Sequence, residues 1–168
     1  MEKINRAILS LGSNIEDRVT YLKRALQQIE EKIGAISQKS SVYQTEAVGF
    51  ISDVPFYNMC VEVKTTLSPE SLLKKTQEIE IGIGRKNKST KFYESRKIDI
   101  DIIFYASRII QTTALSIPHK HYANRKFVLI PLCELNDSIT DPLNTLTVRE
   151  ALVNCSDKSE IKITDIVM

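Results

Sequence analysis

Hydrophobic positions in the first part of the chain follow the two periods of regular secondary structure. Residues 6–11 form an apolar run that predicts a buried strand, and Gly12 ends it. Apolar side chains then recur every three or four positions from Val19 to Ile33, which predicts an amphipathic helix with Gly34 as its C-cap. The pattern therefore predicts a buried strand followed by a helix.

The middle of the chain carries three further strand patterns and one helix pattern. We expect strands over residues 36–45, 57–66 and 97–105, and a loop over 46–55. A helix begins after Ser68, which is suited to cap it because a proline follows at the first helical position. The order of these elements is that of a ferredoxin-like βαββαβ core, which belongs to the α+β class and packs helices on an antiparallel sheet.

The last third of the chain predicts C-terminal additions to this core. They are a short segment at 109–110, a helix over 122–135 and a final strand over 160–166. Thr147 and Glu150 have the spacing of a capping box, which predicts one more helix start. No internal repeat and no linker rich in proline, glycine or serine divides the sequence, so we expect a single domain over residues 1–168.

The composition is that of a globular protein and gives no global electrostatic signal. Of the 168 residues, 42% are hydrophobic and 26% are charged, and the formal net charge is +2. So small a charge gives no reason to expect a nucleic-acid partner, and the apolar runs are far shorter than the ~20 residues that a membrane span needs. Because the three cysteines are widely spaced and no signal-peptide pattern is present, we expect a cytoplasmic protein; we also expect a monomer.

Two aspartates in the strand over 97–105 are the first candidates for chemistry. Side chains alternate along a strand, so Asp99 and Asp101 share one face, about 7 Å apart at Cα, while Ile100 lies on the other. Two such carboxylates can bind hard cations, and phosphoryl-transfer sites often hold two metal ions about 4 Å apart. On alternation alone, the exposed polar face of an amphipathic strand is the more common explanation.

The segment before this strand is strongly basic. Residues 85–97 contain six lysines and arginines against one acid, Glu94, which suits a polyphosphate substrate whose charge is shared with Mg²⁺. A solvated surface loop and a nonspecific nucleic-acid patch are the alternatives. His119 is a single histidine of the kind that is more often structural than catalytic. Neither a phosphate-binding glycine loop nor a serine nucleophile motif is present.

Several ordered motifs resemble those of the 6-hydroxymethyl-7,8-dihydropterin pyrophosphokinases. The strongest is Arg96-Lys97-Ile98-Asp99-Ile100-Asp101-Ile102, which resembles the family signature. The others are Leu11-Gly12-Ser13-Asn14, Tyr43-Gln44-Thr45-Glu46, Phe56-Tyr57-Asn58, Gln77 to Arg85 with Glu80 between them, Pro118-His119, and Arg125 to Leu132. The resemblance extends over residues 6–152, and the order of so many motifs makes it specific.

The resemblance implies an ATP-dependent diphosphotransferase of folate biosynthesis. Such an enzyme transfers the β,γ-pyrophosphoryl group of ATP to the hydroxymethyl oxygen of the pterin and releases AMP. By match of position, two Mg²⁺ ions would be bound by Asp99 and Asp101, and the moving group would be stabilised by Arg85 and Arg96. ATP would be bound by Gln77, Glu80, Arg96, Ile102, His119 and Arg125. The pterin would be bound by Thr45, Val48, Phe56, Asn58 and Phe127.

The sequence also departs from the resembled family and shares features with two other classes. Many members carry a tryptophan before the aspartates, whereas this chain has none and has a longer loop up to Arg96. A ferredoxin-like RNA-binding module would need exposed aromatic residues on its strands, and these strands lack that pattern. A two-metal nuclease could use the same aspartates, with additional carboxylates or histidines.

Overall fold

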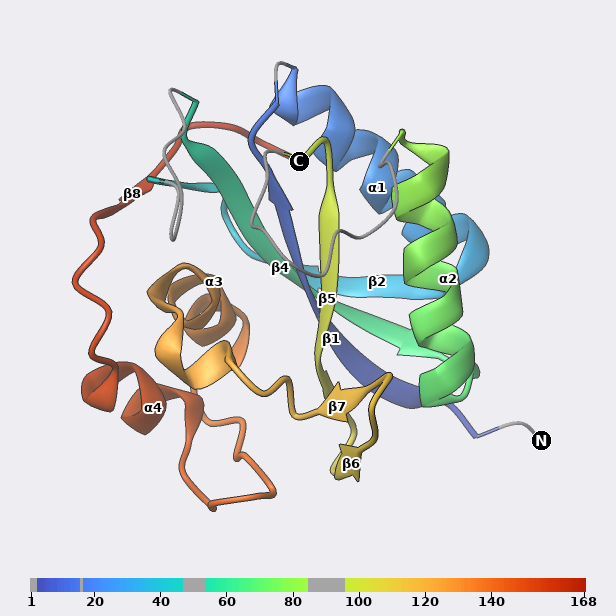
Figure 1. Cartoon of the computed structure of the whole chain (residues 1–168), viewed down its shortest axis with the longest axis vertical. Helices are drawn as coiled ribbons and strands as arrows, with labels where there is room; N and C mark the ends of the chain where they lie inside the picture. The colour runs from blue at the N-terminus through green and yellow to red at the C-terminus, as the bar shows by residue number, and fades with distance from the viewer. Residues whose placement is uncertain (1–2, 16, 47–53, 85–95) are drawn as a thin grey trace.

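A six-stranded antiparallel sheet forms the centre of the fold in the computed structural model, which describes residues 3–15, 17–46, 54–84 and 96–168 (Figure 1). Its strands are β1 (Asn5–Ser13), β2 (Ala35–Lys39), β3 (Tyr43–Thr45), β4 (Phe56–Thr65), β5 (Asp99–Tyr105) and β8 (Ile161–Ile163). The spatial order is β5-β1-β4-β3-β8, and β2 also pairs with β4. This order confirms the predicted α+β class, and β1, β2, β4 and β5 with two helices form the predicted βαββαβ core.

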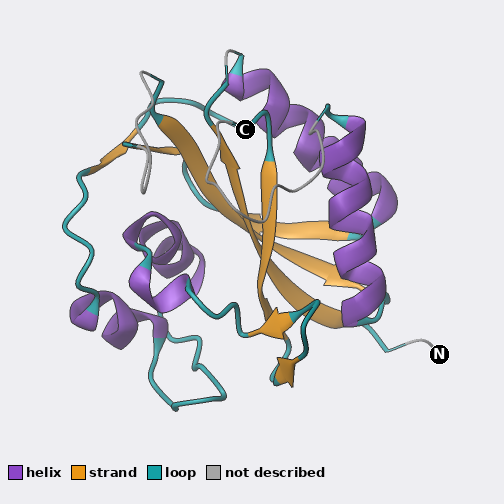
Figure 2. Cartoon of the chain, in the orientation of Figure 1, coloured by secondary structure: helices purple, strands orange, loops and turns teal. Residues whose placement is uncertain are grey.

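Helices cover both faces of this sheet (Figure 2). Helices α1 (Arg18–Lys32) and α2 (Pro69–Gly82) pack on one face, and α3 (Lys126–Asn136) packs on the other, with α4 (Val148–Asn154) against it. A 3₁₀ turn, η1 (Tyr122–Asn124), precedes α3, and β6 (Ile110–Gln111) and β7 (Ser116–Ile117) form a separate two-stranded sheet. Among the described helices, none has the length and apolar character that crossing a bilayer requires.

Strand β1 is apolar on both sides because each face of the sheet is covered. Its residues Ala7, Leu9 and Leu11 belong to the hydrophobic cluster under α1 and α2, whereas Ile8 belongs to the cluster under α3 and α4. A strand that is buried on both faces shows a continuous apolar run instead of alternation. This explains why residues 6–11 lack a polar face in the sequence.

Strand β5 keeps a polar face beside its apolar one. Ile100 and Ile102 pack in the cluster under α1 and α2, so the intervening aspartates face the side that carries α3. A bulge follows, because Ile8 pairs with Phe104 while the next residue of β1 pairs with Ile102. Ile103 is the extra residue, and both it and Phe104 are buried in the cluster under α3. The predicted alternation around the aspartates is confirmed.

Three predicted elements differ in extent from the observed ones. The single strand expected over 36–45 is divided, because three residues, 40–42, lie opposite only two of β4. The helix expected over 122–135 is interrupted at Arg125, whose backbone is extended. The strand expected over 160–166 is paired only at Ile161–Ile163, since β3 offers three partners.

Of the four described glycines, Gly34 has the least room for a side chain. Its φ is 155°, and a Cβ atom there would lie 2.1 Å from the carbonyl oxygen of Lys64. We expect Gly34→Ala to lower the free energy of unfolding by about 2 kcal/mol or more, because backbone has to move. Gly82→Ala is the matched control, since a Cβ at Gly82 meets nothing within 4 Å. Urea unfolding of the two variants measures the difference, and equal stabilities would contradict this account.

Candidate functional site

Two aspartates of β5 lie beside arginines, one just before the strand and one from the start of α3. Asp99 and Asp101 have side chains that are 22% and 25% exposed, so solvent and ligands can reach them from a partly buried position. The Arg96 Nη1 atom lies 2.6 Å from Asp99 Oδ2, and the Arg125 Nη1 atom lies 3.6 Å from Asp101 Oδ2. Each carboxylate therefore has a guanidinium neighbour. The two arginines, Arg96 and Arg125, are 29 positions apart in the sequence.

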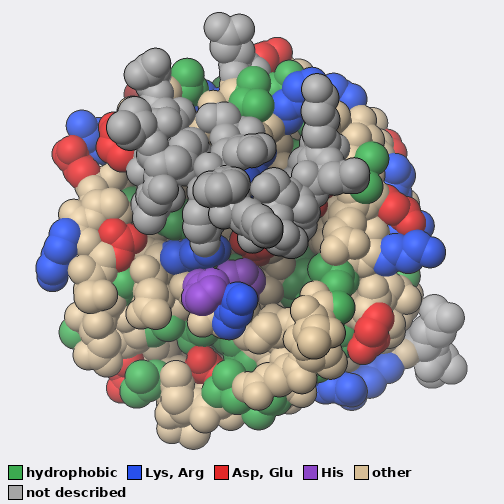
Figure 3. Space-filling view, viewed as in Figure 1, with side chains coloured by type: hydrophobic (Ala, Val, Ile, Leu, Met, Phe, Trp, Pro, Cys, Tyr) green, Lys and Arg blue, Asp and Glu red, His purple; other side chains and the backbone are tan. Residues whose placement is uncertain are grey.

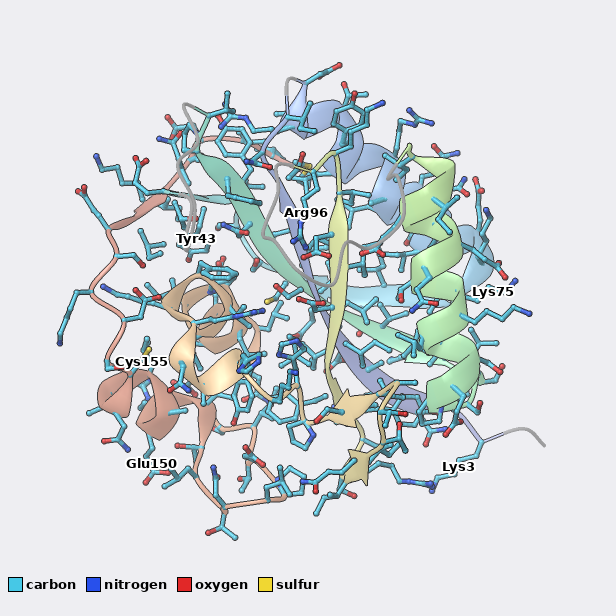
Figure 4. All side chains as sticks on the ribbon, in the orientation of Figure 1. Lys3, Tyr43, Lys75, Arg96, Glu150 and Cys155 are labelled. Atoms are coloured by element: carbon cyan, nitrogen blue, oxygen red, sulfur yellow. The ribbon has the colours of Figure 1, made fainter. Side chains whose placement is uncertain are left out.

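Arg96 is fixed at the N-terminal end of β5 by its backbone (Figure 4). Its N–H donates to the Asn14 side-chain oxygen at 2.7 Å, and the Asn14 N–H donates to the Arg96 carbonyl at 3.1 Å. Asn14 directly follows β1, so these two bonds join the end of one central strand to the start of its neighbour. The sequence prediction did not assign a role to Asn14, although it lies in one of the quoted motifs.

Glu80 supports the aspartate strand from α2. It is 2% exposed, and its Oε1 atom accepts the backbone N–H of Ile100 at 2.8 Å. Among the described residues β5 pairs on one side only, with β1, and α2 supplies the acceptor for this amide. Gln77, one helical turn earlier, is exposed. Ile102 is 4% exposed, with its side chain in the cluster under α1 and α2, on the face opposite the aspartates.

His119 lies close to the aspartate strand and is neutral at pH 7. Its backbone N–H donates to the Ile103 carbonyl at 3.0 Å, and its imidazole Nδ1 accepts the backbone N–H of His121 at 3.2 Å. The Nε2 atom lies 3.9 Å from Asp101 Oδ2 and carries the proton, because Nδ1 is an acceptor. Burial, and secondarily the positive charge of Arg125, lower the pKa of His119 to about 4. Figure 3 shows the two histidines of the chain side by side on this face, next to basic side chains.

A second polar cluster lies on the same face of the sheet, across β1 from the aspartates. The Asn58 Nδ2 atom donates to the Thr45 hydroxyl oxygen at 2.9 Å, and both residues are 3% exposed. Gly12 lies between them and Asp99 in the register of the sheet. A Cβ at Gly12 would be 2.9 Å from Asn58 Oδ1 and 3.7 Å from the ring of Phe56. Gly12 therefore allows the amide and the ring to approach the backbone, a role that the sequence prediction left out.

Two half-buried aromatic residues complete the described part of this face. Phe56 begins β4, and Phe127 is the second residue of α3. The Arg125 guanidinium lies 5.8 Å from the centre of the Phe127 ring, within the range of a cation–π contact. The start of α3 thus presents one basic and one aromatic side chain toward the polar face of the sheet. Arg85 and Val48 lie outside the described residues, as does most of the basic segment, and their roles stay predictions.

Comparison with known sequences identifies one family over most of the chain. A family model described as 7,8-dihydro-6-hydroxymethylpterin-pyrophosphokinase (HPPK) matches residues 8–137. The 2-amino-4-hydroxy-6-hydroxymethyldihydropteridine pyrophosphokinase of Aquifex aeolicus is 35% identical over 142 residues, covering 84% of this chain and 87% of that protein. The enzyme with the same name from Bacillus subtilis is 39% identical over 132 residues, covering 78% of each chain.

Comparison with solved structures supports the same fold. Wild-type HPPK-DHPS of Plasmodium falciparum is similar to this chain with a TM-score of 0.75 and 19% sequence identity. The similarity covers 92% of this chain and 45% of that larger chain. At this level of identity the similarity concerns the fold alone.

The environment of His119 predicts an unusual titration. In the metal-free protein its pKa is about 4, against an ordinary value of about 6.5, so the unfolded chain binds more protons between these two values. The contribution of His119 to stability is therefore complete above about pH 6.5 and is lost as the pH falls to 4. NMR titration of the two imidazoles, assigned with His119→Gln, measures this pKa. Titration of His119 at or above 6.5 would contradict the described environment, and His121→Gln is the control.

Proposed function

Because the chain belongs to the 7,8-dihydro-6-hydroxymethylpterin-pyrophosphokinase (HPPK) family, we propose that the sheet face carrying Asp99 and Asp101 is its active site. The enzyme transfers pyrophosphate from ATP to 6-hydroxymethyl-7,8-dihydropterin in folate biosynthesis. The hydroxymethyl oxygen forms a bond to the β-phosphorus, the bond from that phosphorus to the oxygen it shares with the α-phosphorus breaks, and AMP and a proton are released. The observation that carries the site assignment is the pairing of each aspartate with an arginine, Asp99 with Arg96 just before β5 and Asp101 with Arg125 at the start of α3.

The donor set of this face fits Mg²⁺. Asp99 and Asp101 offer hard carboxylate oxygens, and Mg²⁺ in phosphoryl-transfer sites is held by one or two carboxylates together with phosphates and water. In the described part of the chain no group of three or more acidic, histidine or cysteine side chains could hold a metal by itself. We propose that the two aspartates hold two Mg²⁺ ions, which would neutralise phosphate charge when bound.

Charged and neutral donors around the aspartates suit the phosphate chain. A guanidinium has five N–H donors, so Arg96 can contact Asp99 and phosphate oxygens together, and Arg125 can do the same beside Asp101. His119 offers an uncharged Nε2–H group at the same carboxylate, and this donor persists through the physiological pH range. We assign these three residues to ATP, with Arg85 as a further arginine on the moving group.

The three remaining residues assigned to the nucleotide site differ in burial and would act on the nucleotide in different ways. Exposed Gln77 can contact ATP directly from α2, whereas buried Glu80 acts through the Ile100 amide that it holds between the aspartates. Ile102 can contribute only backbone to the aspartate face, because its side chain lies in the opposite cluster. These three residues therefore shape the nucleotide site in three distinct ways.

The second polar cluster suits the pterin. The Asn58 amide can donate to and accept from the polar edge of a flat heterocycle, and its bond to Thr45 fixes its orientation. Phe56 and Phe127 are half-buried, so their rings can pack against the two faces of the heterocycle. We assign Val48, in the loop before β4, to the same ligand. The pterin then lies beside the carboxylates that receive the pyrophosphate donor.

The cysteines support an intracellular, reducing environment. All three of the chain's cysteines have free thiols, and burial raises the pKa of the Cys60 thiol to about 12, so it is inert. We propose that the enzyme works in the cytoplasm as a monomer. The large exposed hydrophobic side chains of the described residues come from several separate elements.

Removal of either carboxylate tests the active-site assignment. We expect Asp99→Ala and Asp101→Ala to lower kcat by about 10³-fold or more, because the phosphate-bound cations lose their protein ligand. The assay is AMP release from ATP and Mg²⁺, run with and without 6-hydroxymethyl-7,8-dihydropterin, and circular dichroism verifies the fold. Asp165→Asn, an exposed aspartate in the C-terminal segment, is the matched control. Wild-type turnover by either alanine variant would refute the assignment.

The close approach at Gly12 tests the pterin assignment separately. We expect Gly12→Ala to raise the KM for the pterin about ten-fold, because a Cβ 2.9 Å from Asn58 Oδ1 displaces the amide. The KM for ATP should change less than two-fold, since the nearest atoms to this Cβ belong to Asn58 and Phe56. Steady-state kinetics with each substrate varied in turn measure both constants. Unchanged pterin affinity would remove Asn58 from the proposed pterin contacts.

A further inference from the structure

The C-terminal strap, defined here as residues 157–164, runs beside two parts of the proposed site. After α4 it passes along the outer side of α3 and reaches the sheet at β8 (Figure 1). Figure 4 labels Cys155 at the end of α4, where this segment begins. The strap lies beyond residues 8–137, the range that the family model matches. The residues that the strap contacts, among them Lys126 and Thr45, lie inside that range.

Asp157 caps α3 from outside the helix. Its Oδ2 atom accepts the backbone N–H of Lys126, the first residue of α3, at 2.9 Å. Arg125 at the N-cap position makes no capping bond with its own side chain, so the strap supplies this acceptor. A carboxylate at this end of a helix also interacts favourably with the helix dipole. Asp157 therefore holds the backbone between Arg125 and Phe127.

The strap is itself braced against the start of α3. The Asp157 Oδ1 atom accepts the Ser159 N–H at 2.8 Å, and the Lys126 Nζ donates to the Ser159 carbonyl at 3.1 Å. Burial acts to raise the pKa of Asp157, but the hydrogen bonds from Ser159 and Lys126 outweigh it and hold the pKa below its ordinary value. The cap is thus charged at neutral pH, and two hydrogen bonds fix the orientation of its carboxylate.

The other end of the strap supports the polar cluster. Strand β8 pairs with β3, with Ile161 opposite Thr45, so the short strand β3 has a neighbour on each side. Beyond β8, the Thr164 hydroxyl and N–H both donate to the Val42 carbonyl, at 2.9 and 3.0 Å. Thr45 is the residue whose hydroxyl oxygen accepts from Asn58. The strap thus contacts the strand that orients this amide.

We propose that the C-terminal strap is a positioning element for the ligand site, with Asp157 as the positioning residue that sets Arg125 and Phe127 at the start of α3. The inference rests on the proposed roles of these two residues. It assigns Asp157 a part in substrate affinity although it touches neither substrate. The strap fixes two walls of the site that come from different layers of the fold, α3 and the edge of the sheet.

Asp157→Ala in the full-length enzyme tests this role. We expect the KM for both the pterin and ATP to rise about five-fold, the equivalent of one lost helix cap, with kcat within two-fold of wild type. Thr147→Ala is the matched control, because Thr147 makes the same kind of bond at the start of α4. Both variants should lose about 3 °C in Tm. Of these two variants, only Asp157→Ala should raise the KM values. Asp157→Asn keeps an acceptor oxygen, so its KM values should lie between those of Asp157→Ala and the wild type.

Two results would overturn the inference. One is an Asp157→Ala enzyme whose KM values stay within two-fold of wild type while its Tm falls, since the strap would then support the fold alone. The other is an equal rise in KM for Thr147→Ala, since general destabilisation would then explain both. Failure of the proposed function is recognised separately, because the wild-type enzyme would release no AMP in the presence of pterin.

Discussion

The burial of alternate isoleucines on β5 is the constraint on which the described site depends. Ile100 and Ile102 pack under α1 and α2. This packing forces Asp99 and Asp101 onto the opposite face, where Arg125 lies at the start of α3. A register shift of one residue would bury both carboxylates and expose the isoleucines, which costs free energy on both faces. Hydrophobic packing on one side of the strand thus fixes the direction of the charged groups on the other.

The site combines fixed charge with one neutral donor in a partly buried setting. Arg96 and Arg125 supply guanidinium groups beside the aspartates, whereas burial keeps His119 uncharged. Two hydrogen bonds with Asn14, which directly follows β1, hold the backbone at Arg96 before any ligand binds. Such preorganisation lowers the reorganisation that the transfer of a pyrophosphoryl group from ATP to the pterin hydroxyl requires. The aspartate face therefore has its polar groups in place without help from a conformational change of the sheet.

Local patterns were sufficient for the central elements of the fold, and long-range contacts decided the rest. The apolar periods predicted β1, β4, β5, α1 and α2, and the capping residues Ser68 and Thr147 predicted two helix starts correctly, because these signals act within a few residues. The division of 36–45 depends on how many residues of β4 lie opposite, which no local pattern contains. Likewise, the aspartate pair was visible in the strand, but Arg125 approaches it only through the placement of α3. The same holds for Asp157 on Lys126.

The sharing of β1 between the two hydrophobic clusters has a consequence for how the protein loses its structure. Leu9 and Leu11 pack in one cluster, and Ile8 packs in the other. If either helical layer detached, one face of β1 would be exposed to water while the other layer still packed on the opposite face of the same strand. The two halves of the molecule are therefore coupled in a single cooperative unit, in which partial opening gains little entropy and exposes much apolar surface. Since β1 is the strand that pairs with β5 in the described part of the sheet, the aspartates keep their mutual geometry for as long as this unit persists and lose it in the same transition.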